Sequence, residues 1–211
     1  MTNTARKRVG ILIFPDVEVL DFCGPFEVFS LVRLIEERRW HEQSPFEVLL
    51  VAEKPDAIRA SGGLRVAPDY TLDDCPPLHI LVVPGGWGTR REVSNDRLIA
   101  WIAERGKTVE TLTSVCTGAM LLGKAHLLDG KPATTHFKAL DWMRESFPSV
   151  EVHGEVNVVE TDNGRVLTSA GISAGIDMAL QVVARHCGED IARATARFME
   201  YRYPEDNRRH V

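Results

Sequence analysis

Cys116 is the residue whose surroundings favour chemistry most clearly. It lies in the segment Thr-Ser-Val-Cys-Thr-Gly-Ala, residues 113–119, where an apolar strand-like run gives way to a helix-like run. Small residues allow a tight turn there, and such a turn pushes a nucleophile out above a sheet. A helix N-terminus carries about half a positive charge, so the sequence predicts a thiol pKa lowered into the neutral range. The alternative is a small buried core cysteine, the commonest fate of a free thiol.

Two glycines after another apolar run form a second candidate. Gly85 and Gly86 follow Pro84, which ends the run LHILVV at residues 78–83. Glycines let the backbone approach a ligand closely, and their amides are candidates for binding a developing anion. A simple tight turn is the alternative. Trp87, next to them, is a candidate wall of the same pocket.

Proton transfer to or from Cys116 needs a partner, and the sequence offers three. Asp21 is either a helix cap or a proton donor facing the thiol, and Glu18 is its rival on the same segment. A carboxyl group near a thiolate in a poorly solvated site has its pKa raised. His136 is either a base for Cys116 or a hydrogen-bonded structural residue. Thr117, not a histidine, directly follows the cysteine.

The elements that must position these residues alternate between strand and helix patterns. Strands are predicted at residues 9–14, 46–52, 78–83 and 108–113, and helices at residues 98–105, 119–125, 173–186 and 189–201. A further helix is expected to open at Gly24-Pro25, and hairpins are expected around Gly62-Gly63 and residues 162–164. This alternation predicts a mainly parallel sheet covered on both faces. Since ligands bind at the carboxyl ends of such strands, the loops 16–25, 84–89 and 114–118 should meet.

Length and composition narrow the class of protein. The 211 residues are expected to form one α/β domain, 1–211, with tails at residues 1–7 and 204–211. The net charge of −5 argues against a nucleic-acid partner, because non-specific affinity comes from clustered Lys and Arg. No run approaches the roughly 20 apolar residues of a membrane span, so no membrane partner is expected.

The cysteines also limit the kinds of chemistry to be expected. Four of them are widely spaced and form no C-x-x-C pair, so no zinc site or other metal is expected. Without an export signal the expected compartment is the cytoplasm, where thiols stay reduced. Cys23, Cys75 and Cys187 are expected to be core or incidental thiols.

Five segments together resemble the ThiJ/PfpI superfamily, and within it the isonitrile hydratases. The segments are VGILIFPDVEVLDFCGP, VPGGWG, TSVCTGAMLLG, LLDGKPATTH and LTSAGISAGIDMAL. They occur in the family's order from about residue 9 to residue 187.

The resemblance implies a flavodoxin-like three-layer sandwich, a homodimer and a cysteine nucleophile at the elbow. Residue by residue it places the nucleophile at Cys116, its acidic partner at Asp21, the residue after the nucleophile at Thr117, and backbone contacts at Gly85 and Gly86. Many superfamily members carry Glu at the Asp21 position, and peptidase- and deglycase-like branches carry His after the cysteine. The Asp and Thr of this chain fit the hydratase branch.

The resemblance therefore implies a lyase that adds water to an isonitrile through a covalent Cys116 thioimidate, giving an N-substituted formamide without metal or organic cofactor. Two other classes stay open. One is another thiol enzyme of the superfamily, such as a glyoxalase, a deglycase or a stress protein. The other is a non-catalytic ligand-sensing domain, because AraC-type regulators carry input domains with the same CTGA and ATTH signatures.

Overall fold

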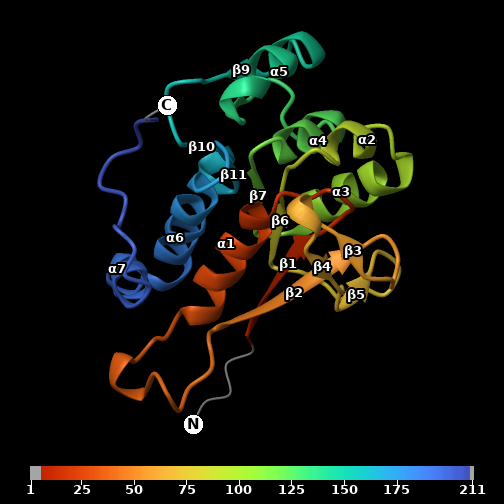
Figure 1. The fold of residues 1–211 in the computed structure, drawn as a ribbon. Helices are drawn as coiled ribbons and strands as arrows, with labels where there is room; N and C mark the ends of the chain where they lie inside the picture. The colour runs from red at the N-terminus through yellow and green to blue at the C-terminus, as the bar shows by residue number, and fades with distance from the viewer. Residues whose placement is uncertain (1–5, 210–211) are drawn as a thin grey trace.

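A largely parallel sheet forms the centre of the protein (Figure 1). The computed structural model describes residues 6–209, and within that range the sheet has seven strands in the order β10-β11-β7-β6-β1-β2-β5. Every neighbouring pair is parallel except the hairpin β10–β11. The strands are β1 (Lys7–Leu12), β2 (Phe46–Ala52), β5 (Tyr70–Thr71), β6 (Ile80–Val83), β7 (Thr111–Val115), β10 (Val158–Thr161) and β11 (Val166–Ser169).

The central strands form where the sequence is continuously apolar or small. Every residue of β6 and of β7 is buried, as expected for parallel strands covered on both faces. The predictions for residues 9–14, 46–52 and 78–83 are confirmed. The fourth predicted strand starts later, at Thr111, because the preceding helix runs through Thr108, whose hydroxyl bonds back to the carbonyl of Arg105.

Helices cover both faces of the sheet, which confirms the flavodoxin-like prediction (Figure 1). On one face α1 packs against α6 and α6 against α7; α3 and α4 pack together on the other. The helices are α1 (Val19–Leu31), α2 (Thr89–Glu92), α3 (Asp96–Thr108), α4 (Gly118–Lys124), α5 (Leu140–Ser146), α6 (Ala174–Cys187) and α7 (Glu189–Phe198).

The start of α1 differs from its prediction. The helix begins at Val19 and carries Pro25 inside it, whereas the sequence suggested an opening at Gly24-Pro25. Proline lacks the N–H that would bond four residues back, so it interrupts one backbone bond without ending the helix. Gly24 lets α1 approach α6 closely, because a Cβ there would lie 3.0 Å from Cγ1 of Ile176. Because α1 begins at Val19, Asp21 lies on its first turn and not in a loop.

Short elements complete the fold. The hairpin predicted around Gly62-Gly63 joins β3 (Ile58–Arg59) to β4 (Arg65–Val66), and the hairpin predicted at 162–164 joins β10 to β11. A separate pair, β8 and β9, runs parallel. The remaining elements are β8 (Pro132–Ala133), β9 (Glu151–Val152), and the 3-10 turns η1 (Glu36–Arg38), η2 (Ser61–Gly63), η3 (Phe137–Ala139) and η4 (Asp162–Gly164).

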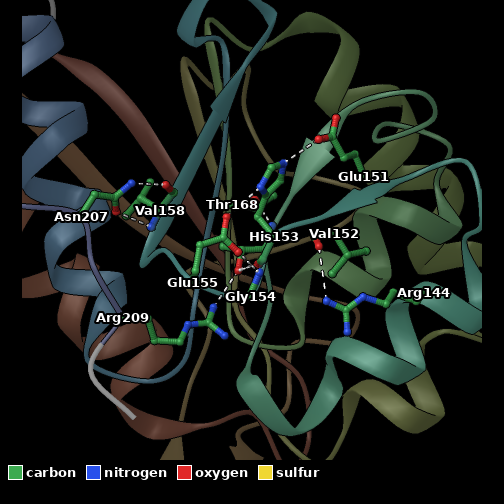
Figure 2. A network of polar contacts seen from close by, with 11 residues as sticks. Arg144, Glu151, Val152, His153, Gly154, Glu155, Val158, Thr168, Asn207 and Arg209 are labelled. Atoms are coloured by element: carbon green, nitrogen blue, oxygen red, sulfur yellow. Dashed lines mark hydrogen bonds and ion pairs between the residues drawn. The ribbon is translucent and has the colours of Figure 1, made fainter.

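The C-terminal residues 204–209 are held against the sheet, so the expectation of a free tail is wrong for them. Figure 2 shows the Asn207 side chain exchanging hydrogen bonds with the backbone of Val158, at 2.8 and 2.6 Å. The Arg209 amide bonds to the Glu155 carbonyl at 3.0 Å. These contacts cover the start of the open edge of β10. At the other end Lys7 already belongs to β1, and residues 1–5 and 210–211 lie outside the described range.

Two kinds of feature are absent from the described residues. No helix there is long and apolar enough to cross a bilayer. The same part of the chain holds no cluster of three or more His, Cys, Asp or Glu side chains suited to a metal ion.

Close packing at the start of α4 gives a first prediction. A Cβ on Gly118 would lie 2.0 Å from the Val83 carbonyl oxygen, and that backbone is fixed within the sheet. We expect Gly118→Ala to lower the free energy of unfolding by roughly 1–3 kcal/mol, measured by urea denaturation.

Gly106→Ala in α3 is the matched control. Its Cβ would meet side-chain ends and no backbone: Cδ1 of Leu127 at 2.6 Å and Cδ2 of Leu112 at 3.3 Å. A gain in helix propensity of up to about 1 kcal/mol offsets those contacts, so little net change is expected. Equal losses in the two variants would contradict the argument.

Candidate functional site

The strand–turn–helix prediction around Cys116 is confirmed. Cys116 follows β7 directly, has a φ of 56°, and precedes α4 by two residues. Its amide donates to the carbonyls of Ser169 and Ala170, each at 3.1 Å, and its own carbonyl accepts the Thr135 hydroxyl at 2.8 Å. A positive φ in a non-glycine residue costs of order 1–3 kcal/mol and persists only where the surroundings hold it. These bonds fix the backbone at Cys116.

The predicted lowering of the Cys116 pKa is wrong. The side chain is buried, with 6% of the residue exposed. Burial raises the pKa of the thiol well above its usual range, and the nearby Asp21 carboxylate raises it further. Hydrogen bonds from the Thr117 amide and hydroxyl act in the opposite direction and are outweighed. At neutral pH the resting sulfur therefore carries its proton.

Asp21 lies close enough to this thiol to raise its pKa. It is fully buried on the first turn of α1, and its Oδ2 accepts the amide of Gly85 at 3.0 Å. Burial raises the pKa of Asp21 to about 7; the Gly85 amide lowers it, Glu18 raises it, and the Cys116 thiol lowers it. The other oxygen, Oδ1, has no N–H or O–H donor within the described residues. A carboxyl group with such a pKa both accepts and releases a proton near neutrality.

Glu18, the rival acid, lies at a different place in the site. Its amide donates to the Gly85 carbonyl at 2.9 Å, and its side chain lines the cavity. Asp21 is the carboxyl that interacts with the Cys116 thiol, and Glu18 adds a negative charge nearby.

The three predicted loops meet, but the glycine amides are already occupied. The Gly85 amide bonds to Asp21, and the Gly86 amide bonds to the Thr117 hydroxyl at 3.0 Å. That hydroxyl also lies 3.0 Å from the hydroxyl of Thr89. The two glycine amides therefore fix Asp21 and Thr117 instead of standing free for an anion. A Cβ on Gly85 would lie 2.5 Å from the Thr117 nitrogen, so this approach requires glycine.

A cavity of about 280 Å³ opens above the thiol. Six residues named from the sequence line it: Glu18, Gly86, Trp87, Cys116, Thr117 and His136. Asp21 and Gly85 are buried and do not line it. Sequence reasoning missed two cations of the wall, Arg90 and Lys138. Their spacing was the available signal, since Arg90 lies three residues after Trp87 and Lys138 two after His136.

His136 lines the cavity without pairing with the thiol. Its Nδ1 accepts the Lys138 amide at 3.2 Å, and the structure gives no hydrogen bond between its ring and Cys116. Burial lowers the pKa of His136, and the positive charges of Arg209 and Lys138 lower it further. The ring is therefore neutral at pH 7, and its contacts match the structural alternative.

A larger cavity of about 760 Å³ lies elsewhere, bounded by the loop after β1, the end of β2, and helices α2 and α3. It contains none of the residues that the sequence analysis selected. The buried thiol lines the smaller cavity, and the Asp21 carboxyl lies behind it, so this cavity is the candidate active site.

Comparison with known proteins agrees with this geometry. An isonitrile hydratase of Pseudomonas putida is 32% identical over 194 residues, covering 92% of this chain and 78% of that protein. The transcriptional regulator GbdR of Pseudomonas aeruginosa is 27% identical over 202 residues, covering 94% of this chain and 52% of the regulator. The chain thus spans about half the length of that regulator.

A solved structure and a family model complete the comparison. The crystal structure of a ThiJ/PfpI family protein from Pseudomonas syringae superposes with a TM-score of 0.82 at 30% identity, covering 96% of this chain and 78% of that one. The model of the DJ-1/PfpI family matches residues 7–185. With its buried cysteine on a strand–turn–helix elbow, this chain belongs to the DJ-1/PfpI family.

Proposed function

We propose that this protein is an isonitrile hydratase that converts R–NC and water into an N-substituted formamide. The observation that carries the proposal is the buried Cys116–Asp21 pair, whose thiol lines a small cavity. The likeness to the Pseudomonas putida hydratase supports the choice of substrate class. The role of each residue follows from the protons that the reaction must move.

The first step joins sulfur and carbon. The terminal carbon of an isonitrile accepts a nucleophile and then needs a proton at the same atom. Asp21 as carboxylate takes the proton of the Cys116 thiol while the sulfur attacks, and an S–C bond forms. Asp21 then gives that proton to the carbon. The product is the thioimidate R–N=CH–S–Cys116, and Asp21 is again a carboxylate.

The second step uses water. Asp21 removes a proton from water while the water oxygen bonds to the thioimidate carbon. Asp21 then gives that proton to the substrate nitrogen. Collapse of the adduct R–NH–CH(OH)–S breaks the C–S bond and forms the formamide carbonyl. The hydroxyl proton passes back to the departing sulfur, which regenerates the thiol. The amide and hydroxyl of Thr117 hydrogen-bond the sulfur while it carries negative charge.

A ligand-sensing role is the second candidate, because a transcriptional regulator matches 94% of this chain. A sensor binds its ligand without consuming it, so turnover separates the two functions. Turnover of methylglyoxal with no turnover of isonitriles would favour a third class, the glyoxalase-like enzymes.

The activity prediction uses cyclohexyl isocyanide, with the formamide detected by mass spectrometry. Wild type should form product, and Cys116→Ala should form none. Asp21→Asn should lose about 10²-fold or more in turnover, the usual scale of acid–base assistance. Asp21→Glu keeps the carboxyl and should lose less. Product formation by Cys116→Ala would disprove the mechanism.

Glu18→Gln tests the choice between the two acids. The charge of Glu18 raises the pKa of Asp21, so its removal should move the pH profile to lower pH with only a small loss of maximal rate. A loss as large as that of Asp21→Asn would transfer the acid–base role to Glu18.

The raised pKa of Asp21 also predicts a cost in stability. Unfolded Asp21 loses its proton near pH 3.8, and the folded carboxyl keeps it until about pH 7. The wild-type free energy of unfolding should therefore fall across this interval relative to Asp21→Asn, by roughly 4 kcal/mol at most. Urea denaturation at pH 4 and pH 8 measures the change, and other titrating groups cancel in the comparison. A difference between the proteins that stays constant with pH would contradict the assignment.

We further propose that the enzyme is a homodimer and works in the cytoplasm, where its thiol stays reduced. Members of the DJ-1/PfpI family often dimerise. Light scattering at micromolar concentration should give twice the mass of one chain, and a monomer would contradict the proposal.

A further inference from the structure

The wall of the Cys116 cavity carries more positive than negative charge. Arg90 and Lys138 line it, and Glu18 is the one acidic side chain among its described lining residues. The whole chain has the opposite balance, with a net charge of −5. The cations at this cavity therefore do not follow from the composition of the protein.

Arg90 is held in place with its hydrogen-bonding edge unused. Its guanidinium carbon lies 4.1 Å from the centroid of the Trp87 ring and 5.4 Å from that of Trp142. Stacking of this kind occupies the faces of the guanidinium plane, while the N–H groups point outward within the plane. These N–H groups make no hydrogen bond or ion pair with any other described residue. That edge has the geometry for two parallel bonds to a carboxylate.

Lys138 and Arg209 add to the positive electrostatic potential at the cavity. The Lys138 ammonium lies 5.6 Å from the ring of Phe137 and has no carboxylate partner in the described part of the chain. Arg209 donates through one nitrogen to the Thr134 hydroxyl at 2.7 Å and to the Thr135 carbonyl at 2.9 Å. The charges of Arg209 and Lys138 lower the pKa of His136, which shows that their field reaches the cavity wall.

We infer that the substrate of this cavity is an isonitrile that carries a carboxylate, bound by the in-plane N–H groups of Arg90 and by the ammonium of Lys138. This inference rests on the proposed function and narrows it to a substrate class. A cavity of about 280 Å³ suits a short isocyano acid. The isonitrile carbon then meets the thiol of Cys116, and the carboxylate stays at the charged wall. Hydration yields an N-formyl amino acid, so a deformylating reaction is the class that consumes the product.

The experiment compares acids with their neutral esters. Isocyanoacetate and 3-isocyanopropanoate are assayed against their methyl esters, which keep the reacting group and remove the charge. We expect the acids to have kcat/KM values about tenfold or more above those of the esters, mainly through KM. The preference should shrink at about 0.5 M salt, where charges in an open site are screened.

Single substitutions test whether Arg90 and Lys138 cause the preference for acids over esters. Arg90→Gln should raise KM about tenfold for the acids, leave KM for the esters nearly unchanged, and leave kcat nearly unchanged for both. Arg90→Lys keeps the charge without the planar edge and should restore part of the effect. Lys138→Gln should act in the same direction. Lys107→Gln, which removes one charge at the far end of α3, is the control and should change nothing.

A binding measurement separates this inference from the proposed function. Calorimetry on Cys116→Ala with N-formylglycine, and with its methyl ester as the neutral match, needs no turnover. Tighter binding of the acid that Arg90→Gln removes supports the carboxylate site, even if no isonitrile is turned over and the hydratase proposal fails. Turnover of isonitriles with no preference for acids in either assay overturns the carboxylate site alone. An equal effect of Arg90→Gln on acids and esters also overturns it.

Discussion

The burial of Cys116 and Asp21 next to each other, away from water, governs the rest of the site. Both groups are acids, both are almost wholly removed from water, and each raises the energy of the other when both are ionised. A site of this kind holds at most one negative charge at neutral pH. The pKa of Asp21 near 7 makes the carboxyl the group that changes state, and the thiol remains protonated until a substrate arrives. In the reaction that we propose, proton transfer is therefore coupled to sulfur attack, and no thiolate stands ready beforehand.

Much of the fold serves to bring that pair together. The early start of α1 puts Asp21 on a helical turn, where the Gly85 amide holds its carboxyl in one orientation. The elbow presents Cys116 from the opposite side at a positive φ. Gly85 and Gly118 let the ends of β6 and β7 approach within backbone contact, since a Cβ at either would collide with a neighbouring main chain. This is the edge of a parallel sheet where strand order reverses between β1 and β6, the usual place for ligands in such folds.

The sequence predicted what depends on local pattern and failed where tertiary burial decides. Apolar runs identified the strands, and the segment 113–119 identified the elbow, because both signals lie within a few residues. The sign of the Cys116 pKa shift was missed, since a two-turn helix cannot offset the desolvation that the surrounding chain imposes. The glycine amides were expected to be free, and only the folded chain shows that Asp21 and Thr117 use them. Residues 204–209 carry no strand pattern, yet they cover β10 through one asparagine side chain and backbone bonds.

An enzyme and a sensor built on this fold make opposite demands on the same two residues. A sensor is served by a cysteine adduct or a bound ligand that persists, so it gains from a site in which no group can activate water. A hydratase must break the bond between the cysteine sulfur and the substrate carbon in every cycle. It therefore needs a group that acts as an acid in one step and as a base in the next. A carboxyl whose pKa lies near 7 meets that demand, because it gives and takes a proton at comparable cost. Its burial lowers the stability of the folded protein at neutral pH, a cost that binding alone would not require. The raised pKa of Asp21, with its cost in stability, therefore argues for turnover over sensing, independently of any likeness to known hydratases.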